Sequence, residues 1–156
     1  MPDNHLRFHS ANGKRRILVV EDEAINQEML RLILQDTYEI IPALTGTEAL
    51  KAIGEQYETL SLVLLDLNLP DMHGMEVLRQ LKASAATALL PVIVMTADTD
   101  AEIQSLTEGA IDFIPKPYPQ PGVILARVLR TIELSEDRDI IRWTERDHLT
   151  GLYNRE

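Results

Sequence analysis

The segment LVLLDLNLPDMHGMEVL, residues 62–78, contains a strand, a turn and the start of a helix within one short stretch. Its first four residues are all aliphatic, which is typical of a strand buried on both faces of a parallel sheet. Asp66 follows this strand directly, and a helical pattern begins after Gly74. The apolar positions of that pattern recur every three residues: Met75, Leu78 and Leu81.

The same order of strand, turn and helix repeats along the chain. Five short apolar runs are predicted strands: 17–20, 38–41, 62–65, 92–95 and 111–114. Amphipathic helical patterns separate them. Five such units predict an α/β fold, a flavodoxin-like (βα)5 doubly wound parallel sheet with strand order 2-1-3-4-5. In that order the ligand crevice lies at the carboxyl ends of strands 1 and 3.

The first and last helical patterns each have an apolar face. Four residues share one face of the first helix: Ile25, Met29, Leu32 and Ile33. Four residues of the fifth helix are predicted to point inward: Leu125, Val128, Leu129 and Ile132. The fifth pattern continues without Gly or Pro and with many charges, so we predict an extended C-terminal helix.

The 156 residues suit one domain with extra length at its ends. Residues 1–15 are polar and unpatterned, and we interpret them as a flexible leader. The repeating units define a domain over 16–132. Residues 133–148 are predicted to form a charged helical linker that leads away from it.

The composition argues against several classes of function. Apolar residues make up 45% of the chain but aromatic residues only 4%, so the core must be aliphatic. A net charge of −10 argues against nucleic-acid or anionic-lipid partners, because both need a basic face. The polar start and the short apolar runs indicate neither a signal peptide nor a membrane span of roughly 20 residues. We therefore expect a cytoplasmic protein.

Acidic residues gather at the predicted crevice. Glu21 and Asp22 directly follow the first strand, and Asp66 follows the third. Because strands 1 and 3 are neighbours in the predicted order, the three carboxylates should converge. Close like charges are unfavourable unless a cation relieves them. Ligands that are all oxygen suit a hard cation, so we predict a Mg²⁺ site that could also take Mn²⁺.

Two further strand ends complete the crevice. Thr96 follows the fourth strand and Lys116 follows the fifth. A carboxylate nucleophile, a divalent cation, a hydroxyl and an ammonium are the groups that phosphoryl transfer to a carboxylate needs. Each residue alone has an ordinary structural explanation; Asp22, for example, would stabilise a helix N-terminus by roughly 0.3–1 kcal/mol. Their gathering at four strand ends favours catalysis with Asp66 as the acceptor.

Four motifs resemble landmarks of the response-regulator receiver domains of two-component systems, in order and in spacing. They are ILVVEDE (17–23), LLDLNLPDMHGMEVL (64–78), PVIVMTAD (91–98) and GAIDFIPKP (109–117). The resemblance covers 16–132. It implies that a sensor histidine kinase or a phosphotransfer protein phosphorylates Asp66.

The resemblance also implies a role for each residue around the metal. Asp22 and Asp66 would bind Mg²⁺ through their side chains and Asn68 through its backbone carbonyl. Glu21 would support the metal through a water molecule. A glutamate at this position is a common variant in the family.

The family switches between two states, and the resemblance implies which residues do so here. Thr96 would be the switch hydroxyl and Phe113 the switch aromatic, although Phe lacks the hydroxyl of the Tyr that often stands there. The bond between Lys116 and Pro117 is implied to be cis. Phosphorylation would then alter the surface formed by the fourth helix, the fifth strand and the fifth helix.

A second resemblance lies at the end of the chain. DHLTGLYNRE, residues 147–156, is similar to the opening of a GGDEF diguanylate cyclase domain. It implies that 149–156 begin a truncated output domain and that the full-length protein is a diguanylate cyclase. This fragment alone would not be an enzyme beyond its own phosphorylation and dephosphorylation. The partners implied are a GGDEF domain in cis and a phosphorylation-dependent homodimer.

Three other kinds of protein share parts of this pattern. A degenerate receiver that acts only by binding would lack the acids or the lysine, and this chain keeps them. A phosphatase of the aspartate-nucleophile type would carry a second Asp where Asn68 stands. A stand-alone receiver that passes phosphate along a relay, without a cyclase output, stays open.

Overall fold

The computed structural model describes residues 13–151, with side chains described as far as Asp137. Strands and α-helices alternate strictly through this range, with one short 3₁₀ helix, η2. The elements are β1 (Arg15–Val20), α1 (Ala24–Leu34), β2 (Tyr38–Ala43), α2 (Gly46–Gln56), η2 (Tyr57–Thr59), β3 (Leu60–Asp66), α3 (Gly74–Ala83), β4 (Val92–Thr96), α4 (Thr99–Thr107), β5 (Asp112–Pro115) and α5 (Pro121–Gly151).

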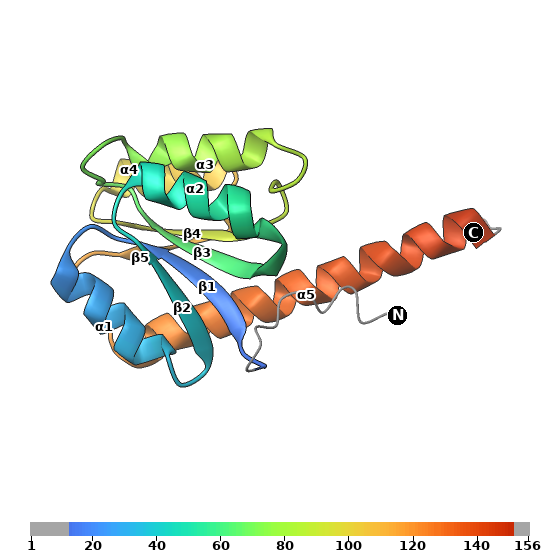
Figure 1. Cartoon of the computed structure of the whole chain (residues 1–156), viewed down its shortest axis with the longest axis horizontal. Coiled ribbons are helices and arrows are strands. Elements are labelled where there is room, and N and C mark those ends of the chain that lie inside the picture. Colours follow the sequence, from blue (N-terminus) through green and yellow to red (C-terminus); the bar gives the residue numbers. More distant parts are fainter. Residues whose placement is uncertain (1–12, 152–156) are drawn as a thin grey trace.

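The five strands form one parallel sheet in the order β2-β1-β3-β4-β5, so the predicted fold and strand order are confirmed. Figure 1 shows the sheet between two layers of helices, with α1 and α5 on one face and α2, α3 and α4 on the other. β1 and β3 lie at the centre, and Val20 pairs with Leu65 near their carboxyl ends.

The central strands carry continuous apolar runs, 17–20 in β1 and 62–65 in β3, because both of their faces are covered. Along β3, Val63 and Leu65 pack under α2 and α3, while Leu62 and Leu64 pack under α1 and α5. All four side chains are fully buried. Burial of an aliphatic side chain of this size contributes roughly 1.5–3 kcal/mol, so these strands supply much of the stability of the fold.

Helix α1 packs on the sheet through a face that overlaps only in part with the one that the sequence pattern predicted. Leu30 and Leu34, one turn apart, are fully buried, whereas Ile25 is 83% exposed. Both faces of this helix carry aliphatic residues, so periodicity alone does not distinguish the face that packs on the sheet. Ile25 and Leu32 lie outside the core, with Ile25 near Pro121 at the start of α5. Met29 and Ile33, in contrast, are half-buried and pack against the core.

Helix α5 packs with a spacing of four residues. Ile124, Val128 and Ile132 are buried against the sheet, and Leu125 is half-buried. The prediction that Leu129 points inward was wrong, since this side chain lies on the solvent side of the helix. Ile124, which was not among the residues predicted to point inward, is fully buried instead.

The extended C-terminal helix is confirmed, because α5 continues without a break to Gly151 (Figure 1). Its first residues beyond Ile132 still touch the domain. Ser135 is buried, and Glu136 forms a two-point ion pair with Arg15 at the start of β1. Within the described part of the chain, no helix combines the length and the apolar character that crossing a bilayer requires.

The start of α3 lies very close to the end of β3. The backbone N–H of Gly74 donates to the carbonyl of Leu67 at 2.8 Å. A β-carbon on Gly74 would lie 2.5 Å from the carbonyl oxygen of Asp66 and 2.7 Å from Cα of Leu67. Backbone atoms cannot move aside cheaply, so this contact requires glycine.

We expect Gly74→Ala to destabilise the domain by about 1–3 kcal/mol, because the added methyl group forces α3 away from β3. Gly54→Ala is the matched control: Gly54 lies within α2 with no atom within 4 Å of the added β-carbon. This control should stabilise by about 0.5–1 kcal/mol through helix propensity. Urea unfolding measures both; equal midpoints for the two variants would contradict the packing argument.

Candidate functional site

Three carboxylates meet at the carboxyl ends of the two central strands. Glu21 and Asp22 follow β1, Asp66 ends β3, and one oxygen from each lies within 4.8 Å of the others. The side chains of Glu21 and Asp66 are buried, whereas Asp22 is exposed. The sequence analysis predicted that these three carboxylates would converge, and they do. A set made only of carboxylate oxygens, open to solvent on one side, fits a hard divalent cation.

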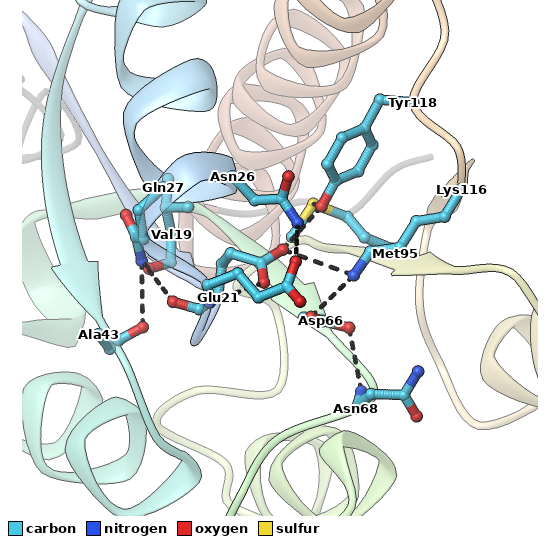
Figure 2. Close-up of polar contacts among 11 residues, drawn as sticks. Val19, Glu21, Asn26, Gln27, Ala43, Asp66, Asn68, Met95, Lys116 and Tyr118 are labelled. Atoms are coloured by element: carbon cyan, nitrogen blue, oxygen red, sulfur yellow. Dashed lines mark hydrogen bonds and ion pairs between the residues drawn. The ribbon is translucent and has the colours of Figure 1, made fainter.

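Lys116 brings a positive charge into this cluster. Its Nζ lies 2.9 Å from Oδ2 of Asp66 and 3.5 Å from Oε1 of Glu21 (Figure 2). Burial opposes the charge on the ammonium, but the hydrogen bond and charge of Asp66, followed by those of Glu21, outweigh it and raise the pKa of Lys116. In their charged forms, three carboxylates and one ammonium leave an excess of negative charge, which a divalent cation would balance.

Both oxygens of Asp66 are engaged. Oδ2 accepts from Lys116, and Oδ1 accepts from the backbone N–H of Asn68 at 3.0 Å. Asp66 is 1% exposed. The carboxylate is therefore held at the strand end in one orientation, within reach of the groups that surround it.

Thr96 ends β4, the strand that pairs with β3 on the side away from β1. Its side chain is buried, and its hydroxyl oxygen accepts from the backbone N–H of Asp98 at 3.1 Å. Asp98 in turn caps the first turn of α4, since its Oδ1 accepts from the backbone N–H of Asp100 at 2.9 Å. The hydroxyl is thus linked directly to the start of α4.

Phe113 lies on β5 and is half-buried against the cluster under α3 and α4. The guanidinium of Arg127 on α5 lies 5.8 Å from the centre of its ring and donates to its backbone carbonyl. Arg127 also lies 3.6 Å from Oδ1 of Asp112.

Further along, the Lys116–Pro117 peptide bond is cis. The predicted strand at 111–114 begins one residue later, at Asp112.

Two residues that the sequence analysis missed also contact the acidic cluster or its backbone. The hydroxyl of Tyr118 donates to Oε1 of Glu21 at 2.8 Å. Nε2 of Gln27 lies within 2.8–3.2 Å of three backbone carbonyls, those of Val19, Glu21 and Ala43 (Figure 2). Tyr118 could have been noticed, since it stands two residues after Lys116; nothing in the sequence marks Gln27.

Asp71 joins the loop after β3 to the start of α2. Its Oδ1 accepts from the backbone N–H of Gly46 at 2.8 Å, and Oδ2 accepts from the backbone N–H and the hydroxyl of Thr47 at 2.9 and 2.6 Å. The hydroxyl bond is the largest cause, and together these bonds lower the pKa of Asp71 to about 2. The loop that carries Asn68 is thereby tied to its neighbour.

The chain that forms this fold and this arrangement of side chains matches a known protein family. The model of the response regulator receiver domain matches residues 17–129 of the chain. The chain belongs to this family. It is therefore the receiver domain of a two-component response regulator, a class that interacts with histidine kinases and binds Mg²⁺ through an acidic cluster. In this receiver the cluster is made by Glu21, Asp22 and Asp66.

Two curated relatives illustrate the similarity. The receiver is 38% identical to the DNA-binding response regulator MtrA of Mycolicibacterium paratuberculosis over 127 residues, which are 80% of this chain and 54% of that protein. It is 36% identical to the phosphate regulon transcriptional regulatory protein PhoB of Escherichia coli over 117 residues, 73% of this chain and 50% of that protein. The chain thus spans about half the length of these relatives.

Solved structures share the receiver's architecture. A CheY-like response regulator receiver domain protein from Methanospirillum hungatei matches with a TM-score of 0.73 at 28% identity, over 80% of this chain and 98% of that chain. The chemotaxis response regulator CheY4 of Vibrio cholerae matches with a TM-score of 0.69 at 25% identity, over 76% of this chain and 98% of that chain. Both agree with the sheet order described above.

The contacts of Asp71 predict a pH-dependent contribution to stability. Its pKa is about 2 in the folded receiver against an ordinary 3.8, so the contribution is present above 3.8 and is lost as the pH falls through about 2. Relative to wild type, Asp71→Asn should be destabilised by a constant amount above about pH 5, and the difference should shrink toward zero near pH 2.

Chemical unfolding at a series of pH values measures this difference. Asp36→Asn, which removes an exposed carboxylate in the turn after α1, controls for the change in net charge. A difference between wild type and Asp71→Asn that does not change with pH would contradict the prediction.

Proposed function

We propose that Asp66 is the phospho-acceptor of this receiver. The observation that carries the proposal is the convergence of two other carboxylates and of Lys116 on Asp66 at the end of β3. The carboxylate would attack phosphorus as the bond between phosphorus and the donor's imidazole nitrogen breaks, and the imidazole leaves with the electron pair. A histidine kinase or a phosphotransfer protein supplies that phosphohistidine.

The acidic cluster would hold Mg²⁺, for which Mn²⁺ could substitute. Asp22 and Asp66 would bind it by side chain, Asn68 by its backbone carbonyl, and Glu21 through water. The cation supplies positive charge next to the phosphoryl oxygens. Lys116 supplies a second positive charge from the other side, and it is already held against Asp66 at 2.9 Å.

Phosphorylation would be transmitted through Thr96 and Phe113. The Thr96 hydroxyl, at present bonded to the N–H of Asp98, would turn toward the new phosphoryl oxygens. Phe113 would then rotate inward, and Arg127 would lose its position over the ring. Because α4 starts at the Asp98 cap and Arg127 belongs to α5, both helices would respond.

The output domain is a separate proposal that rests on residues 147–156, DHLTGLYNRE, which resemble the opening of a GGDEF domain. Residues 152–156 lie outside the described part of the structure. Of the relatives named above, MtrA is a DNA-binding response regulator and PhoB is a transcriptional regulatory protein, which supports a DNA-binding output as the second candidate. A stand-alone relay receiver is the third. The coding sequence after Glu156 discriminates them, because a GGDEF signature downstream would belong to a cyclase alone.

The phospho-acceptor proposal is tested by incubating the protein with Mg²⁺ and a small phosphodonor such as acetyl phosphate. Intact-mass spectrometry should detect one added phosphoryl group, which Asp66→Asn abolishes. Lys116→Gln should slow labelling by roughly a hundredfold, because one preorganised positive charge is lost from the transition state.

Asp36→Asn, far from the cluster in sequence and in the fold, should label at the wild-type rate. Labelling of Asp66→Asn at the wild-type rate would refute the assignment of Asp66. Equal labelling with and without Mg²⁺ would refute the role of the acidic cluster.

For a cyclase output the useful response is dimerisation, because two nucleotide-bound sites must meet. We expect a phosphate mimic with Mg²⁺ to strengthen self-association of the chain by roughly tenfold, within the usual range of coupling between sites. Sedimentation velocity across a concentration series measures this. Asp66→Asn is the control that should not respond; identical association with and without the mimic would contradict the proposal.

A further inference from the structure

Tyr118 inserts its ring between the core and the acidic cluster. The residue stands two positions after Lys116, and its ring packs against the cluster of apolar side chains under α1 and α5. Its hydroxyl lies 2.8 Å from Oε1 of Glu21 and 3.5 Å from Sδ of Met95 (Figure 2). A phenol hydroxyl at this distance from a carboxylate oxygen donates its proton to the bond, because the carboxylate has none to give. The hydroxyl is therefore a fixed hydrogen-bond donor that points at a carboxylate.

Glu21 depends on donors from the protein because its side chain is fully buried. Oε2 accepts from the backbone N–H of Glu23 at 3.2 Å. Oε1 accepts from Tyr118 and has Lys116 Nζ at 3.5 Å. A buried carboxylate that loses a donor takes up another partner if one is within reach, because an unsatisfied buried charge is costly. For Oε1 that partner is Lys116.

Lys116 is thus shared unequally between two carboxylates. It lies 2.9 Å from Asp66, a hydrogen-bond distance, and 3.5 Å from Glu21. The hydroxyl of Tyr118 supplies the short bond to Oε1 of Glu21 that the ammonium would otherwise make. Because Tyr118 is the hydrogen-bond partner of Glu21, Lys116 remains the partner of Asp66, the proposed phospho-acceptor.

We propose that Tyr118 is a positioning residue: its hydroxyl satisfies and orients Glu21, so that Lys116 stays on Asp66 and Glu21 stays open to the metal site. This inference rests on the proposed function and extends it by one residue. Without the hydroxyl, Lys116 moves toward Glu21, where it competes with a cation for the same carboxylate and withdraws from Asp66.

The test is Tyr118→Phe, which removes the hydroxyl and keeps the ring in the core. Isothermal titration with Mg²⁺ should give a dissociation constant raised roughly tenfold, the usual size for loss of a hydrogen bond to a metal-supporting residue. At saturating Mg²⁺, phosphorylation by acetyl phosphate should also slow roughly threefold to tenfold, because the transition state loses part of the charge of Lys116.

Tyr38→Phe is the matched control. Tyr38 is buried in the same apolar cluster, but it pairs with Arg15 at the amino end of β1, the edge of the sheet opposite the acidic cluster. In Tyr38→Phe, the dissociation constant for Mg²⁺ and the rate of phosphorylation should both stay within twofold of wild type. In a Glu21→Gln background, Tyr118→Phe should likewise change each constant by less than twofold, because the neutral amide does not attract Lys116.

The outcomes separate this inference from the proposed function. If the wild-type protein binds Mg²⁺ and labels Asp66, but Tyr118→Phe matches it within twofold, the positioning role is refuted. The role is also refuted if Tyr118→Phe and Tyr38→Phe lose Mg²⁺ affinity and phosphorylation rate to the same extent. It is refuted likewise if Tyr118→Phe causes the same loss in the Glu21→Gln background as in the wild-type protein. If the wild-type protein neither binds Mg²⁺ nor becomes labelled, the proposed function itself fails and the inference fails with it.

Discussion

Parallel pairing of β1 with β3 fixes the positions of the acidic cluster. Backbone hydrogen bonds hold Val20 beside Leu65, so the residues that follow these two must emerge at the same edge of the sheet. A shift of one residue would carry Arg16 or Glu21, the charged residues that bound the apolar run of β1, into the apolar layers, which opposes slippage. Glu21 and Asp66 are therefore close for a reason unrelated to their own charges, which repel. The energy of the apolar core holds the acids together.

Contacts outside the acidic cluster hold the backbone segments that carry it. Gln27 joins the ends of β1 and β2 through three carbonyls, and Asp71 ties the loop after β3 to the start of α2. Gly74 lets α3 begin directly behind Asp66. None of these residues faces a substrate. Together they fix the backbone around the cluster, in which Asp22 is exposed and Lys116 contacts both Asp66 and Glu21.

Much of this could be predicted from the sequence, and the exceptions have physical reasons. Continuous aliphatic runs mark doubly covered strands, and the order of elements constrains the sheet, so the fold and the meeting of the three acids could be predicted. The buried face of α1 and the exposure of Leu129 could not, because aliphatic residues lie on more than one side of each helix and tertiary packing selects between them. Gln27 acts through distances between elements, which no spacing along the chain encodes. Tyr118 stands close to Lys116 in the sequence, but its contact with Glu21 also depends on the fold.

Helix α5 packs on the core in its first half and extends beyond the sheet in its second half (Figure 1). Ile132 is its last fully apolar anchor on the sheet, and the ion pair between Glu136 and Arg15 lies one turn further on. Beyond that pair the helix runs for about 15 more residues, or about 22 Å at 1.5 Å per residue. The part of the helix inside the domain, from Pro121 to Glu136, is about as long. A tilt of about 10° about the ion pair would displace Val128 by about 2 Å and Gly151 by about 4 Å, so a repacking beneath Val128 would be roughly doubled at the far end.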